Sequence, residues 1–170
     1  GHMIVDIGGG TTDVAVISLG GIVAATSVKH AGNKIDQAIT DYIKKTFNLS
    51  IGDKTAEEVK IKIGSAVPVE EELVHTIKGR DLMSGLPRFA EIRTNEIVRA
   101  IDGELREVIK AIKTVFQDTP PELAADIIDY GIIMSGGSSL LRNLSELVYR
   151  RTGVKAIVAD DALYCVAKGT

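Results

Sequence analysis

A run of three glycines, Gly8-Gly9-Gly10, lies between two apolar stretches and constrains the fold of this sequence more than any other feature. Residues 3–7, the glycines and residues 14–18 predict a strand, a tight turn and a second strand. Glycine adopts positive φ angles easily and has no side chain to keep a ligand away from the backbone. Successive N–H groups in such a turn form a concave site for anions, so we expect the turn to bind phosphate.

Polar residues on both sides of the turn support this interpretation. Thr11 and Thr12 can donate hydroxyl hydrogen bonds, and Asp6, at the end of the first strand, can hold a cation or a water molecule beside the phosphates. The pattern is not the dinucleotide-binding fingerprint, because a β-rich run follows the glycines instead of a helix. It is not a P-loop either, because no Gly-Lys-Ser/Thr follows. A glycine-rich hairpin turn without a ligand remains the alternative.

Composition sets broad limits on the class of protein. With 170 residues, 45% of them hydrophobic and 25% charged, the chain can form one compact unit with a sizeable core. A net charge of -3 argues against a general nucleic-acid or anionic-membrane surface. A single cysteine, Cys165, allows no internal disulfide and favours a reducing cytoplasm. No stretch approaches the ~20 apolar residues of a membrane span, and no signal peptide is recognisable.

The first residues have the form of an expression remnant. Gly1-His2 ahead of Met3 is typical of a protease-cleavage scar. Because the apolar run of the first strand begins at once, we expect the chain to be a piece of a longer protein.

The order of the expected elements predicts a mixed sheet with helices packed against it. Residues 3–7, 14–18 and 22–29 form an antiparallel meander, with Gly20-Gly21 as its second turn. Further strands are expected over residues 73–78, 87–93, 131–135 and 154–159, with a turn at Gly79. Helical spacing of apolar residues predicts helices over residues 34–47, 53–63, 95–116, 122–128, 140–152 and 163–168. Their expected caps are Asn33 and Thr94 at the start and Asn48, Gly64 and Gly153 at the end.

Two subdomains are expected from this order. After a start at residues 1–3, residues 4–49 and 94–170 form the core subdomain, and residues 50–93 form a small α+β insert. The acidic cluster at residues 70–72 in the insert is interpreted as a solvated face. His30 and His75 each lack a second His or Cys at ligand spacing, so no metal or catalytic role is predicted for them.

A second glycine turn, Gly136-Gly137, follows the predicted strand 131–135 and precedes a helix. Backbone N–H groups at such a point can also face a ligand. Two glycine turns at strand ends of one sheet can face one cleft, which favours a shared ligand site.

Two motifs resemble those of the actin-like ATPases. Residues 6–13, DIGGGTTD, are similar to the second phosphate motif of that superfamily, and residues 133–139, IMSGGSS, are similar to its adenosine motif. Within the superfamily the chain resembles the bacterial MreB cell-shape family. Nearly letter-for-letter similarity to that family covers residues 18–23, 79–82, 84–87 and 119–127.

The resemblance implies an α/β fold, an actin-like ATPase (ribonuclease H-like) domain that forms the second large domain of such a protein. It also implies roles for single residues. The β- and γ-phosphates would be held by Gly8, Gly9, Gly10, Thr11 and Thr12, and Asp6 would face Mg²⁺ through water. The adenosine side would be formed by Gly136, Gly137, Ser138, Gly32, Glu57 and Lys60. For Glu57 and Lys60, one helical turn apart, an ordinary surface pair remains the alternative.

The resemblance further implies ATP hydrolysis coupled to filament assembly in the full-length protein, which controls cell shape and directs cell-wall synthesis. The other phosphate loop and the carboxylate that orients water would lie upstream, so this part alone should bind ATP weakly and not hydrolyse it. The implied partners are further copies of the protein and the membrane adaptor RodZ, which binds the core subdomain. No nucleic acid and no direct membrane contact are expected, and the full-length protein would lie in the cytoplasm at the inner face of the cell membrane.

Two other classes of function remain open. A chaperone-like or sugar-kinase-like member of the same superfamily would share the phosphate turn, although a kinase needs a site for an acceptor substrate. A binding module that uses the fold without nucleotide is the other alternative.

Overall fold

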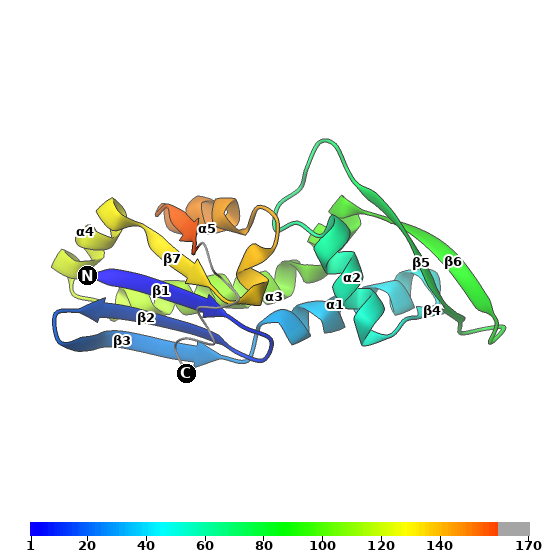
Figure 1. The fold of residues 1–170 in the computed structure, drawn as a ribbon, viewed down its shortest axis with the longest axis horizontal. Helices are drawn as coiled ribbons and strands as arrows, with labels where there is room; N and C mark the ends of the chain where they lie inside the picture. The colour runs from blue at the N-terminus through cyan, green and yellow to red at the C-terminus, as the bar shows by residue number, and fades with distance from the viewer. Residues whose placement is uncertain (160–170) are drawn as a thin grey trace.

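Residues 1–159 are described in the computed structural model, and they form two β-sheets joined by helices (Figure 1). The larger sheet has its strands in the order β3-β2-β1-β7-β8. These strands are β1 (His2–Ile7), β2 (Thr12–Ser18), β3 (Gly21–Val28), β7 (Ile132–Ser135) and β8 (Ala156–Val158). The first three are antiparallel neighbours, whereas β7 runs parallel to both β1 and β8. The predicted mixed sheet with an antiparallel meander is therefore confirmed.

Side-chain alternation decides which face of β1 and β2 is buried. Met3, Val5 and Ile7 of β1 are almost fully buried, as are Val14 and Val16 of β2. Successive residues of a strand point to opposite faces, so every second apolar residue enters the core.

The helices cover this sheet and connect it to the smaller one. They are α1 (Gly32–Phe47), α2 (Asp53–Ile63), α3 (Thr94–Gln117), α4 (Pro121–Tyr130) and α5 (Leu144–Thr152). The longest, α3, packs on β2 and β3 with an apolar stripe that includes Ile101, Leu105 and Val108. Helix α4 contacts β1, and α5 contacts β8.

The smaller sheet lies at the other end of the molecule from the β2–β3 turn (Figure 1). It consists of β4 (Leu49–Ser50), β5 (Val74–Asp81) and β6 (Pro87–Arg93), all antiparallel. The predicted turn at Gly79 is wrong, because Gly79 lies inside β5 and pairs with Arg88. A Cβ at Gly79 would lie 2.5 Å from the carbonyl oxygen of Ser50, so the close approach of β4 accounts for this glycine. The actual turn contains Gly85, at φ 74°.

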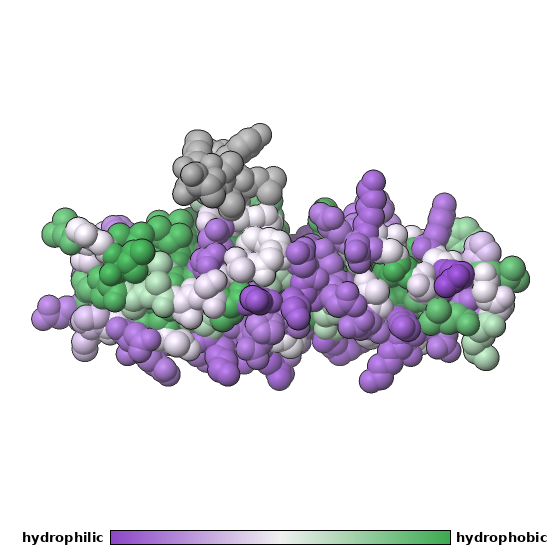
Figure 2. Space-filling view, turned by 90° about the horizontal axis from the view of Figure 1, so that it is seen from below, coloured by the Kyte–Doolittle hydropathy of each residue, from purple (hydrophilic) through white to green (hydrophobic). Residues whose placement is uncertain are grey.

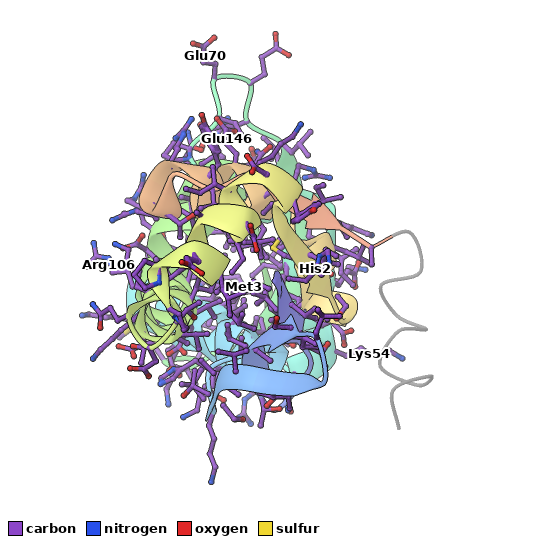
Figure 3. All side chains as sticks on the ribbon, turned by 90° about the vertical axis from the view of Figure 1, so that its left-hand side faces the viewer. His2, Met3, Lys54, Glu70, Arg106 and Glu146 are labelled. Atoms are coloured by element: carbon purple, nitrogen blue, oxygen red, sulfur yellow. The ribbon has the colours of Figure 1, made fainter. Side chains whose placement is uncertain are left out.

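A long loop between α2 and β5 projects from the molecule, with Glu70 pointing away near its tip (Figure 3). Asn95 holds the base of this loop. Its amide nitrogen donates to the Val69 carbonyl oxygen and its amide oxygen accepts from the Val69 N–H, both at 2.9 Å. Glu70 and Glu71 are exposed as predicted, but Glu72 accepts a hydrogen bond from the Asn95 N–H at 2.9 Å.

Three predicted helix starts differ from the structure. Helix α1 begins at Gly32, with Ala31 in the cap position, because the N–H of Asn33 donates to the Gly9 carbonyl oxygen. Helix α3 is capped at Arg93, whose N–H donates to the Glu96 carboxylate at 2.8 Å.

The third difference concerns the predicted helix 140–152. A 3₁₀ turn, Gly137–Leu140, comes first, and α5 starts only at Leu144. The predicted ends at Asn48, Gly64 and Gly153 are confirmed. The predicted helix 163–168 and Cys165 lie outside the described residues.

Buried side chains of the two sheets form one continuous core. It runs from Val5 in the larger sheet through Ile43 of α1 and Val59 of α2 to Ile77 and Ile92 of the smaller sheet. The division into a core subdomain and an insert over residues 50–93 therefore stays a prediction. Over residues 1–159, no helix is both long enough and apolar enough to cross a bilayer.

Candidate functional site

The two glycine turns meet where β1 and β7 end. In the parallel register Asp6 pairs with Ser135, and the Ser135 hydroxyl donates to Asp6 Oδ1 at 3.2 Å. Three residues further along, the Ser138 hydroxyl donates to the carbonyl oxygen of Gly8, also at 3.2 Å. The strand ends are thus joined on both sides of the second turn, as we expected from the two motifs.

Gly136 makes this close approach of the strands possible. A Cβ at this position would lie 2.4 Å from the Ile7 carbonyl oxygen and 2.6 Å from Asp6 Oδ1. Its φ of +86° is also unfavourable for any residue with a side chain. Only glycine allows β7 to pass the end of β1 at this distance.

Residues 30–33, at the junction of β3 and α1, hold the first glycine turn through two backbone hydrogen bonds. The Gly32 N–H donates to the Gly8 carbonyl oxygen at 3.0 Å, and the Asn33 N–H donates to the Gly9 carbonyl oxygen at 2.8 Å. Within the turn, the Gly8 N–H donates to the Thr11 carbonyl oxygen at 3.0 Å. In the described part of the chain, the N–H groups of Gly9 and Gly10 have no backbone acceptor. These two amides are therefore free to face a ligand.

A cavity of about 520 Å³ opens beside the two turns. Its walls come from the first glycine turn, the start of α1, one face of α2 and the segment after β7. The lining residues are Gly8, Gly9, Gly32, Asn33, Ile35, Asp36, Glu57, Lys60, Ile61, Gly137, Ser138, Leu140, Leu141 and Arg142. The cavity is thus formed jointly by residues of the predicted core and of the predicted insert.

Seven of the residues predicted from the sequence line this cavity. They are Gly8, Gly9, Gly32, Glu57, Lys60, Gly137 and Ser138. Asp6 and Gly136 lie next to it at the strand ends. Gly10 and Thr11 are exposed but do not line the cavity, and the Thr11 hydroxyl donates to Asp13 at 3.2 Å.

Thr12 differs from its prediction. Its side chain is fully buried, and its hydroxyl donates to the carbonyl oxygen of His30 at 2.6 Å. The prediction that this hydroxyl faces a phosphate is therefore wrong. Thr12 belongs to β2, where it points to the same face as Val14 and Val16, so strand alternation turns it into the core.

Seven further residues line the cavity but were not predicted as site residues. They are Asn33, Ile35, Asp36, Ile61, Leu140, Leu141 and Arg142. Ile61 and Leu140 are 65% and 58% exposed, which is unusual for large apolar side chains in helical segments. The position of Ile61, off the buried stripe of Ala56, Val59 and Ile63, was the signal that could have identified it.

Asp36 and Lys60 face one another across the cavity wall, one from α1 and the other from α2. Lys60 Nζ lies 2.8 Å from Asp36 Oδ1, and both side chains are less than one-fifth exposed. At this distance the carboxylate and the ammonium form an ion pair between α1 and α2. Burial raises the pKa of the Asp36 carboxyl above its ordinary value, against the opposing effect of Lys60. Asp36 and Lys60 therefore place a paired carboxylate and ammonium in the cavity wall.

Comparison with known proteins identifies the family of this chain. The family model described as MreB/Mbl protein matches residues 1–170. The chain belongs to the MreB/Mbl family. The cell shape-determining protein Mbl of Bacillus subtilis (strain 168) is 46% identical over 170 residues, which are 100% of this chain and 51% of that protein. MreB of Escherichia coli (strain K12) is 44% identical over 169 residues, 99% of this chain and 49% of that protein.

This MreB/Mbl chain thus spans about half the length of the curated relatives that it matches. Solved structures agree with the family. MreB5 of Spiroplasma citri bound to AMPPNP superposes with a TM-score of 0.95 at 43% identity, over 99% of this chain and 51% of that one. A non-polymerising MamK mutant bound to AMPPNP has a TM-score of 0.75 at 23% identity, over 96% and 50% of the two chains, which shows the fold alone. The predicted actin-like α/β fold and the resemblance to the MreB family are both confirmed.

Proposed function

We propose that this chain is the second large domain of a filament-forming, actin-like ATPase that controls cell shape and directs cell-wall synthesis, and that its cavity binds ATP. The observation that carries the proposal is the convergence of both glycine turns on one cavity. The structures of MreB5 of Spiroplasma citri with AMPPNP and with ADP support it, because this chain is 43% identical to the matched half of that protein.

The first glycine turn would hold the terminal phosphates. The free N–H groups of Gly9 and Gly10 would supply donors at this turn. The Thr11 hydroxyl, which here donates to Asp13, would exchange that bond for one to a phosphate oxygen. The carboxylate of Asp6 lies at the adjoining strand end, where it fits a Mg²⁺ ion held through water. Such an ion would neutralise charge on the phosphates.

The nucleoside would lie deeper, between α1, α2 and the segment after β7. The Asp36 carboxylate and the Lys60 ammonium, which pair with one another in the cavity wall, suit the hydroxyls of a ribose. The exposed apolar side chains of Ile61 and Leu140 suit the two faces of a base. Gly137 and Ser138 would complete the adenosine side, with Glu57 at its rim.

Hydrolysis would require the other half of the full-length protein. Phosphoryl transfer depends on positioning and on charge neutralisation around the phosphates. This chain supplies one phosphate turn, so we expect it to bind ATP weakly and not to hydrolyse it. ATP between two large domains would favour a closed state through contacts made only there.

Self-assembly would use the two apolar ends of the domain. Figure 2 shows hydrophobic surface at both ends of the molecule. At one end, Leu19 and Ile22 of the β2–β3 turn are 105% and 69% exposed. At the other end, Met83 and Leu86 of the β5–β6 turn are 86% and 64% exposed. Different patches at opposite ends can join head to tail, which gives filaments when the contacts do not close into a ring.

The remaining partners follow from family membership. The membrane adaptor RodZ would bind the core subdomain, which would keep the full-length protein at the inner face of the cell membrane. Neither nucleic acid nor lipid would bind this part directly. Pull-down of the RodZ cytoplasmic domain with residues 3–159 tests the first of these points.

Calorimetric titration of Mg·ATP into this chain and into the full-length protein tests the proposed site. We expect tight binding only in the full-length protein, and weaker binding when Lys60 is replaced by Ala. Lys62→Ala is the matched control, because Lys62 lies on the same helix but forms an exposed pair with Glu58. Micromolar binding by the short chain, or equal effects of the two variants, would contradict the proposal. Electron microscopy of the full-length protein with and without ATP tests assembly.

A further inference from the structure

His30 and Glu104 connect the support of the first glycine turn to α3. His30 Nδ1 lies 2.6 Å from Glu104 Oε2, and the two side chains are 33% and 25% exposed. The residues are 74 positions apart in the sequence. A short contact to a carboxylate in a partly buried place is stronger than an ordinary surface hydrogen bond.

The backbone of His30 is itself part of the support. Its carbonyl oxygen accepts the buried hydroxyl of Thr12 at 2.6 Å. The following Gly32 and Asn33 hold the carbonyl oxygens of Gly8 and Gly9. Three hydrogen bonds thus join residues 30–33 to the glycine turn and to Thr12 directly after it.

Helix α3 gives this segment a firm anchor. Leu105, next to Glu104, is buried against the sheet, as are Ile101 and Val108 one turn to either side. His30, by contrast, lies in the short link of residues 29–31 between β3 and α1, and Gly32 and Asn33 are the first two residues of α1. The His30 ring therefore ties a connecting segment to a well-packed helix.

Other roles for His30 do not fit the geometry. Within residues 1–159 no group of three His, Cys, Asp or Glu side chains could hold a metal ion. The ring is outside the cavity lining, and its Nδ1 is occupied by Glu104. An effect of His30 on a nucleotide must therefore pass through the backbone that it positions.

We propose that His30 and Glu104 are positioning residues for the terminal phosphates: their contact fixes residues 30–33 against α3 and so sets the place of the Gly9 and Gly10 amides. This inference rests on the proposed function. The two residues would affect the binding of phosphates and not of the nucleoside, because the segment that they anchor is hydrogen-bonded to the first glycine turn.

A double-mutant cycle in the full-length protein tests this inference. The affinities for Mg·ATP and for adenosine are measured for wild type, His30→Ala, Glu104→Ala and the double variant. We expect each single change to weaken Mg·ATP binding by about five- to tenfold, the double variant to be no weaker than the singles, and adenosine binding to change less than about twofold.

Conservative variants distinguish a positioning role of the two side chains from a general loss of folded structure. His30→Asn keeps a donor near the place of Nδ1, and Glu104→Gln keeps an acceptor, so both should retain most of the Mg·ATP affinity. Glu107→Ala, on the same helix and without a partner among the described residues, is the control and should change nothing. Thermal unfolding of each variant shows whether the fold is intact.

Three results would overturn the inference. The first is unchanged Mg·ATP affinity in both single Ala variants, and the second is a double variant whose loss of Mg·ATP affinity equals the product of the two single losses. The third is a loss of adenosine affinity as large as the loss of Mg·ATP affinity. Failure of the wild-type protein to bind Mg·ATP would instead contradict the proposed function.

Discussion

The hydroxyl of Ser138 donates to the carbonyl oxygen of Gly8 at 3.2 Å and so joins two glycine turns that are 130 residues apart in the sequence. The hydroxyl oxygen of Ser138 also lies close to Gly32, where a Cβ would approach this oxygen to 2.6 Å. Ser138 thus connects the two glycine turns that line the cavity.

Replacing Ser138 by Ala should loosen this connection. We expect unfolding free energy to fall by about 1 kcal/mol, because one partly buried hydrogen bond is lost, and Mg·ATP affinity of the full-length protein to fall severalfold. Urea denaturation and calorimetry measure the two effects. Ser27→Ala, at an exposed position of β3, is the control and should alter neither.

Gly136→Ala should destabilise the domain strongly. The added Cβ would meet the backbone oxygen of Ile7 at 2.4 Å, and φ at this position is +86°. We expect a loss of about 2–4 kcal/mol in unfolding free energy, measured by urea denaturation. Gly103→Ala provides the contrast, since Gly103 lies in α3 with no heavy atom near its Cβ position. That change should stabilise by about 0.5–1 kcal/mol, and similar results for both variants would refute the steric explanation.

Thr12→Val keeps the shape of the side chain and removes its hydroxyl. The carbonyl oxygen of His30 then loses its donor, so we expect destabilisation by about 1–3 kcal/mol. Thr12→Ser should recover part of this loss. Thr11→Val, at the exposed neighbouring position, should leave the unfolding free energy within about 0.5 kcal/mol of wild type. If the Thr11 and Thr12 variants were equally stable, the buried hydrogen bond would not be important.

The raised pKa of Asp36 predicts a pH dependence with a definite sign. The folded state binds a proton at Asp36 at higher pH than the unfolded chain does, because burial disfavours the charged carboxylate. Stability of the wild type relative to Asp36→Asn should therefore rise as pH falls through the folded pKa towards the ordinary value of 3.8. Urea denaturation of both proteins between neutral pH and pH 4 measures the difference. A wild type that loses stability relative to Asp36→Asn on acidification would show the opposite sign.

A single charge at either apolar end should prevent assembly. Leu19→Glu and Met83→Glu place a carboxylate on opposite ends of the domain, where the proposed head-to-tail contact would bury it. We expect neither variant of the full-length protein to sediment as filaments, while both keep wild-type Mg·ATP affinity. Tyr149→Glu, at an exposed position of α5 away from both ends, should still assemble. Normal filaments from both end variants would exclude these ends as the contact.

Local rules predicted much of this fold. The meander and the long helix α3 repeat apolar residues at the periods of strand and helix, and both glycine turns were recognised because they follow apolar strands. For Thr12 the alternation with Val14 and Val16 indicates burial, and this signal outweighs the presence of a hydroxyl group beside the glycines. Gly79 was taken for a turn because a close approach of another strand cannot be read from sequence.

Residues that contact the site only through tertiary packing were the hardest to foresee. Asp36 lies one helical turn after Gly32, so its place beside the cavity follows once the start of α1 is known. Its partner Lys60 comes from α2, and the distance between these helices depends on the whole core. No local pattern contains that distance.

The core that runs without interruption from the larger sheet to the smaller one has a practical consequence for screening. With no boundary at which one part could melt first, residues 1–159 should lose their structure in one cooperative step. A compound bound between α1 and α2 touches both parts, so it would raise the melting temperature of the entire unit. A simple thermal-shift measurement would then report on ligands of this site without any enzymatic readout.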